Sequence, residues 1–144
     1  MKIVNSMFLT PLKMQPLDDD KTWVLLDKLV YQSVILNTTL EIPAGYTTDL
    51  ASVPRLPIIY YLWGSRAHHE AIPHDWIYGT HIVSKKLADL VFLEAMKARN
   101  KKRWIYEPMY LAVKYGGFKS YRDGVEKFKR QNPQIPYPEP LKLK

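Results

Sequence analysis

The chain has 144 residues and a mass of 16.9 kDa, which is the size of one compact domain that folds without covalent cross-links. It contains no cysteine, and this excludes disulfides, thiol catalysis, iron–sulfur clusters and cysteine-ligated zinc. No stretch approaches about 18 consecutive apolar residues, so we expect no membrane-spanning segment, and the N-terminus lacks the apolar core of a secretory signal.

The net charge of +7 is concentrated in the last third of the chain. Residues 1–96 carry 8 basic and 10 acidic side chains, whereas residues 97–144 carry 13 and 4. Such a basic segment is typical of a solvated lysine-rich surface, or of a surface that meets nucleic acid, anionic lipid or an acidic protein. Lys101, Lys102 and Arg103 are candidate binding residues. Nucleic acid is the less favoured partner, because no nucleic-acid-binding motif accompanies this cluster.

Strands are predicted in the first third of the chain. Segments rich in β-branched and aromatic residues lie within residues 1–12, 22–26, 29–36 and 38–42. Residues 14–21 are expected to form a turn or loop. Pro43 and Gly45 are expected to end the sheet, and residues 46–65 to form an ordered loop.

Helices are predicted in the second half. They cover residues 66–80 with Ser65 as N-cap, 85–99 with Ser84 as N-cap, about 103–115, and a short basic segment at 118–130. Pro73 lies inside the first, which should therefore begin near it or kink. On 85–99, Leu87, Leu90 and Val91 share one apolar stripe, with Phe92 and Met96 beside it.

Strands followed by helices indicate an α+β fold, with a small N-terminal antiparallel sheet followed by a bundle of three to four helices. We expect residues 1–130 to form a single α+β domain. Residues 131–144 contain four prolines and are expected to form an extended arm. Such an arm either docks on a partner or neighbouring subunit, or frays in solvent.

A candidate catalytic group is formed by His74, Tyr78 and Asp89. The short connection between the two predicted helices makes them antiparallel, which brings His74 within reach of Asp89. A carboxylate on one imidazole nitrogen fixes the tautomer and leaves the other nitrogen as a base. The alternative is a satisfied polar network that fixes the register of two packed helices.

Asp75 and Asp49 are candidate metal ligands, because oxygen donors of this kind suit Ca²⁺, and a polarised water beside a histidine base is a hydrolytic arrangement. The alternative for Asp49 is an ordinary loop role, in which it bonds neighbouring backbone amides or pairs with Arg55. Zinc is the less favoured metal. It would use His69 and the other histidines, all four of which lie within residues 68–81. Ser52 and Arg55 are further candidate binding residues, although Ser52 lacks the G-x-S-x-G setting of a nucleophile.

Three ordered motifs carry a family resemblance. They are GYTTDLASVPR at 45–55, HDWIY at 74–78, and ADLVFLEAM at 88–96. Over residues 22–117 the chain resembles a family of small phage and prophage proteins catalogued as a domain of unknown function. The resemblance implies a bacteriophage origin, with a location in the host cytoplasm during infection or in the virion, and it implies no reaction.

The helical core also resembles that of secretory phospholipases. This likeness implies that His74 is the base, Asp75 the calcium ligand and Asp89 the group that orients His74, with Tyr78 bonded to Asp89. The chain departs from those enzymes in having no disulfides and no Gly-rich calcium loop. We therefore expect a phage-encoded hydrolase acting on a phospholipid or cell-envelope substrate. The alternative is a non-enzymatic virion component that contacts phage structural proteins, or a protein that contacts a host envelope component.

Overall fold

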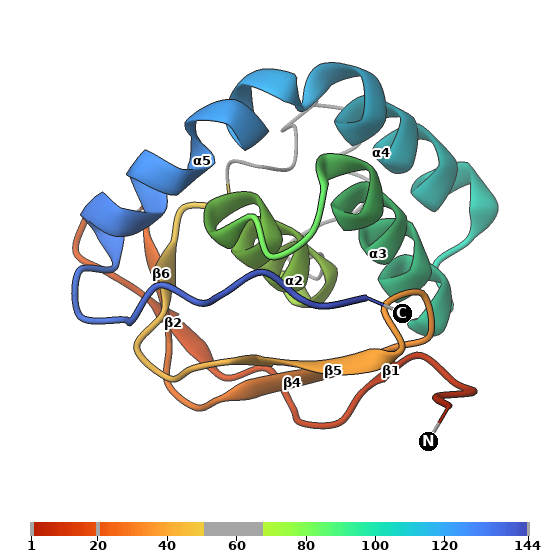
Figure 1. Cartoon of the computed structure of the whole chain (residues 1–144), viewed down its shortest axis with the longest axis horizontal. Helices are drawn as coiled ribbons and strands as arrows, with labels where there is room; N and C mark the ends of the chain where they lie inside the picture. Colours follow the sequence, from red (N-terminus) through yellow and green to blue (C-terminus); the bar gives the residue numbers. More distant parts are fainter. Residues whose placement is uncertain (1, 20, 51–67, 144) are drawn as a thin grey trace.

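A computed structural model describes residues 2–19, 21–50 and 68–143, and it has the α+β order predicted from the sequence (Figure 1). Within these residues, short strands come first and helices follow. The strands are β1 (Met7–Phe8), β2 (Met14–Pro16), β3 (Trp23–Leu25), β4 (Leu29–Ser33), β5 (Thr38–Ile42) and β6 (Thr47–Thr48). The helices are α2 (His68–Thr80), α3 (Lys85–Ala98), α4 (Arg103–Gly116) and α5 (Phe118–Gln131).

The strands form two small antiparallel sheets, in the orders β1-β4-β5 and β2-β3-β6. β4 and β5 are joined by a tight turn in which Asn37 has a φ of 50°. The expectation of a loop at 14–21 is wrong for β2, because an edge strand tolerates Pro16 without losing a ladder hydrogen bond. Strand pairing also resumes after Pro43 and Gly45, since β6 pairs with β3.

The helix boundaries follow local signals in the sequence. Ser84 caps α3, and its hydroxyl accepts a hydrogen bond of 3.3 Å from the Leu87 amide. α2 continues through Pro73, so a start of this helix near the proline is excluded. The predicted loop over 46–65 is described only as far as Leu50, and Ser52, Arg55 and Ser65 lie outside the described residues.

The helices lie on one side of the sheets, with α2 in the middle of the molecule (Figure 1). α2 contacts α3, α5 and β5, whereas α4 packs on α3 and more lightly on α5. The core between these layers includes the fully buried Ile72, Ile77, Val91 and Phe92. Among the described residues, every helix is too short or too polar to traverse a lipid bilayer.

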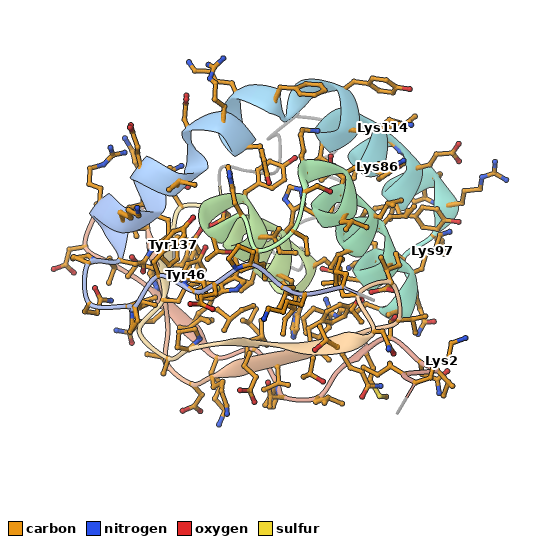
Figure 2. All side chains as sticks on the ribbon, viewed as in Figure 1. Lys2, Tyr46, Lys86, Lys97, Lys114 and Tyr137 are labelled. Atoms are coloured by element: carbon orange, nitrogen blue, oxygen red, sulfur yellow. The ribbon has the colours of Figure 1, made fainter. Side chains whose placement is uncertain are left out.

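The segment after α5 is extended and packs on its own domain. The Tyr137 hydroxyl donates a 2.8 Å hydrogen bond to the Thr80 carbonyl at the end of α2. The Leu141 amide donates a 2.9 Å hydrogen bond to the Ile82 carbonyl in the α2–α3 connection. The Tyr137 and Tyr46 rings, both labelled in Figure 2, each contact the Phe128 ring, with centroid distances of 5.7 Å and 6.1 Å. The arm therefore covers the end of α2 in the same molecule.

Candidate functional site

The α2–α3 hairpin brings His74 and Asp89 together. α2 ends at Thr80, the next residue, His81, turns the chain with a φ of 51°, and α3 begins at Lys85. The two helices then pack against each other along their length. His74 Nε2 lies 2.9 Å from Asp89 Oδ1, so the contact predicted from the helical spacing is confirmed.

Asp89 accepts three hydrogen bonds. Besides His74, the Tyr78 hydroxyl donates to Oδ1 at 2.6 Å and the Lys85 ammonium group donates to Oδ2 at 2.7 Å. Burial raises the pKa of Asp89, but the hydrogen bonds from His74, Lys85 and Tyr78 outweigh burial and hold this pKa below its usual value. Asp89 is therefore an anion at neutral pH and can only accept hydrogen bonds.

An ionised Asp89 determines the tautomer of His74. Since Asp89 can only accept, His74 Nε2 carries the proton that lies between them, and in the neutral ring the lone pair is on Nδ1. The imidazole is fully buried, with its centroid 4.1 Å from the Tyr78 ring and 4.9 Å from the Phe92 ring. The arrangement holds the ring in one orientation, which is what a positioned general base requires.

Asp75 faces a different set of partners. Its Oδ2 accepts hydrogen bonds from the Tyr46 hydroxyl at 2.7 Å and from the Thr48 hydroxyl. Burial and the Asp75 charge raise the pKa of Tyr46 well above its usual value, so Tyr46 remains a hydrogen-bond donor. Thr48 is the last residue of β6, and Tyr46 immediately precedes this strand. The β6 segment therefore positions the Asp75 carboxylate of α2.

A small cavity of about 40 Å³ lies beside Asp75. Its lining includes Tyr46, Asp75, Tyr78 and Lys127, and therefore combines a carboxylate, an ammonium group and two phenols. A space of this size holds one or two water molecules between polar partners. Tyr78 lines the cavity and also binds Asp89, so the cavity and the His74–Asp89 pair share one side chain.

Asp49 lies near the same cavity as Asp75, because Lys127, which bonds Asp49, also lines that cavity. Asp49 is paired with Lys127 of α5, whose Nζ lies 2.7 Å from Oδ2. Within the described part of the chain, no group of three or more histidine, aspartate or glutamate side chains is arranged to hold a metal ion. The lysine supplies the charge that a cation would otherwise supply to Asp49.

The other predicted site residues have separate surroundings. The His69 ring lies 5.5 Å from the Phe8 ring, whereas the His81 ring stacks on Tyr121 at 3.8 Å. The side chain of His68 is outside the described residues, as are Ser52 and Arg55.

The three basic candidates also differ from one another. Lys101 Nζ lies 3.9 Å from Glu70, Arg103 Nε lies 2.7 Å from Glu107, and Lys102 is exposed at the start of α4.

Lys85, Lys127, Tyr46 and Thr48 were not predicted as site residues. Lys85 could have been found, because it precedes Asp89 by four residues and so lies on the same face of a helix. Lys127 is 78 residues from Asp49, and no local pattern indicates a contact over that distance.

Comparison with known proteins identifies a family. A family model described as a protein of unknown function, DUF1353, matches residues 23–113. The match runs from β3 into α4 and includes His74, Asp75, Tyr78 and Asp89. Comparisons with curated proteins and with solved structures found no match. The chain therefore belongs to the DUF1353 family of proteins of unknown function.

Proposed function

We propose that this protein is a phage-encoded hydrolase in which His74 is the general base. The observation that carries the proposal is the buried contact between His74 Nε2 and an ionised Asp89. Within the hairpin, Asp89 is held by Tyr78 and Lys85 as well, so its orientation does not depend on the histidine alone. A base that is fixed by a carboxylate, which is itself fixed by two further donors, is pre-organised for proton transfer.

In the proposed step, Nδ1 of His74 takes a proton from water as the water oxygen attacks a carbonyl carbon. The resulting imidazolium is stabilised by Asp89. It then returns the proton to the leaving group, at the oxygen of an ester or at the nitrogen of an amide. One water is consumed and one ester or amide bond is broken. Because His74 is fully buried, the substrate must reach it through an opening of the site. The substrate class that we propose is a phospholipid or a cell-envelope ester or amide.

We extend the proposal to a Ca²⁺ ion at Asp75 and Asp49. Tyr46 and Thr48 occupy Oδ2 of Asp75, and among the described residues Oδ1 accepts no hydrogen bond and can face the cavity. A cation there would have to displace the Lys127 ammonium from Asp49. Thermal unfolding with Ca²⁺ should therefore show a rise that Asp75→Asn abolishes and Lys127→Ala enlarges, with Asp123→Asn as control. If Ca²⁺ raises the unfolding temperature of none of these proteins, the proposed Ca²⁺ site is wrong, whereas the proposed role of His74 as the base is unaffected.

Hydrolysis is tested with His74→Asn, which keeps a hydrogen-bond donor near Asp89 but removes the base. We expect release of fatty acid from phospholipid vesicles, or of fragments from envelope preparations, by the wild type and at least a hundredfold loss in the variant. His81→Asn is the control, because His81 is a half-buried histidine whose ring bonds the Tyr121 carbonyl and not Asp89. Equal turnover by His74→Asn and the wild type would exclude His74 as the base.

A second candidate is a non-enzymatic phage protein, either in the virion or in the host cytoplasm during infection. Full burial of His74 and the ion pair between Lys85 and Asp89 favour it, since both belong equally to a network that locks α2 to α3. It predicts no turnover by the wild type, a lower unfolding temperature for His74→Asn, and the protein in stoichiometric amounts in purified particles by peptide mass spectrometry. Turnover that depends on His74 would exclude it.

A further inference from the structure

α4 has two apolar faces, and only one of them is packed. Met109 and Val113 are buried against the rest of the domain. On the opposite side, Trp104, Leu111 and Tyr115 are 57%, 42% and 70% exposed. A helix on the surface of a protein ordinarily presents polar residues on its outer face, so this second apolar face requires an explanation.

The exposed residues form a continuous line. At about 100° per residue, positions 104, 111 and 115 lie within about 40° of one another around the helix. Phe118, at the start of α5, is 64% exposed, but the Lys85 ammonium of α3 lies 4.3 Å from its ring centroid, so we do not count it with these three. We call Trp104, Leu111 and Tyr115 the outer α4 face. α4 is an outer helix, with α3 between it and the sheets (Figure 1), so nothing in the described part of the chain covers this face.

Basic side chains are frequent on α4 and on the start of α5. Lys102, Arg103, Lys114, Lys119 and Arg122 are all exposed, and of these Arg103 is paired with Glu107 and Arg122 with Asp123. The Lys114 ammonium lies 5.3 Å from the centroid of the Tyr115 ring, and Figure 2 shows Lys114 on the outer side of α4. Residues 101–131 carry nine basic and three acidic side chains. The charge around the apolar line is therefore positive.

We propose that the outer α4 face docks on the surface of an anionic lipid bilayer. Such a surface accepts aromatic and aliphatic side chains at the level of the headgroups, while lysine and arginine reach the lipid phosphates. An anionic bilayer would contact both the apolar line and the basic side chains near it. A nucleic acid would use the basic side chains but would gain little from Leu111. The inference goes beyond the proposed hydrolysis and does not depend on it.

The test is co-sedimentation of the full chain with vesicles of phosphatidylcholine alone and of phosphatidylcholine mixed with phosphatidylglycerol. We expect binding to the mixed vesicles and little binding to the neutral ones. Leu111→Ser with Tyr115→Ser should weaken binding at least tenfold, since two exposed apolar side chains are lost. Lys114→Gln with Lys119→Gln should weaken it by about tenfold or more at low salt.

Matched controls come from other parts of the surface. Leu26→Ser removes a leucine that is 50% exposed beyond β3, and Lys2→Gln removes an exposed lysine near the N-terminus. Neither should change vesicle binding. The His74→Asn variant should bind as the wild type does, so a failure of hydrolysis and a failure of docking are separate results.

Three results would overturn the proposal. The first is equal binding of the outer-face variants and the wild type to the mixed vesicles. The second is a wild-type dimer, seen by sedimentation equilibrium, that Leu111→Ser with Tyr115→Ser converts to monomer without any vesicle binding by either protein. The third is salt-sensitive binding to nucleic acid that Lys114→Gln with Lys119→Gln weakens, with no binding to vesicles.

Discussion

The ammonium group of Lys85 lies 2.7 Å from Oδ2 of Asp89, one helical turn further along α3. The same nitrogen donates hydrogen bonds to the carbonyls of Val113 at 2.9 Å and Lys114 at 3.1 Å, in the last turn of α4. Lys85 thus connects the candidate catalytic pair to the C-terminal end of α4, where helix carbonyls lack partners within their own helix and favour a positive charge.

Lys85→Met should destabilise the protein by about 2–4 kcal/mol, because it leaves Asp89 with one donor fewer and removes the cation at the end of α4. The midpoint of urea unfolding measures this change. Lys86→Met is the control, since Lys86 is the exposed neighbour and should change stability by no more than about 0.5 kcal/mol. Equal effects of the two substitutions would show that the Lys85 contacts contribute nothing to stability.

The low pKa of Asp89 makes its contribution to stability depend on pH. Because the pKa in the folded state lies below the usual value of 3.8, the contribution is present at pH values above about 4 and is lost as the pH falls through the lowered pKa. Asp89→Asn should therefore be destabilising at pH 7, and its difference from the wild type should shrink below about pH 4. Urea unfolding over this range measures both, with the exposed Asp123→Asn as control. A penalty that stays constant with pH would contradict the assignment.

Local signals in the sequence predicted most of the elements and the central contact. The Ser84 cap and the short α2–α3 connection act over a few residues, and both are present. The His74–Asp89 contact could be predicted because it follows from two helices and their short connection. Each of these features depends on neighbours in the sequence.

Features that depend on distant segments were missed. On α3 the buried residues include Asp89, Phe92 and Met96, whereas in the expected stripe Val91 is buried but Leu87 and Leu90 are only half-buried. Periodicity cannot choose between two neighbouring stripes, because the choice depends on where the sheet lies. Glu94 shows the cause, since it accepts hydrogen bonds from the Tyr31 and Ser33 hydroxyls and from the Ile35 amide, about 60 residues away.

Glu70 should respond to pH in the opposite sense to Asp89. Its side chain is fully buried, and Oε2 has no hydrogen-bond partner in the described part of the chain. Burial raises the pKa of Glu70 above its usual 4.5, against the lowering effects of its own backbone amide, Arg99 and Lys101. Since the folded state holds this proton more tightly, the wild type should lose stability as the pH rises from 4.5 through the raised pKa.

Glu70→Gln cannot lose a proton, so its stability relative to the wild type should improve as the pH rises, by at most about 1.4 kcal/mol for each pH unit. Urea unfolding of both proteins from roughly pH 4 to pH 8 measures the difference. Glu126→Gln on α5 is the control, because Glu126 is exposed. Parallel stability curves for Glu70→Gln and the wild type would show that Glu70 does not titrate in this interval.

Gly124 lets α5 lie directly on α2. A Cβ atom at this position would overlap the carbonyl oxygen of Tyr78, which belongs to backbone and cannot rotate away. Gly124→Ala should therefore push α5 from α2 and destabilise the protein by about 2 kcal/mol, even though alanine favours helix over glycine by about 1 kcal/mol. It should also disturb Tyr78, and through it the hydrogen bond to Asp89.

Gly116→Ala provides the matched control, because a Cβ there meets nothing within 4 Å and Gly116 is the last residue of α4. This substitution should leave stability unchanged or raise it by up to about 1 kcal/mol. The unfolding temperatures of the two variants should thus move in opposite directions, or only that of Gly124→Ala should fall. Equal stability of both variants would mean that α2 and α5 are further apart than this contact requires. In that case Lys127 of α5 would also lose its place beside Asp49, and the lining of the small cavity would change with it.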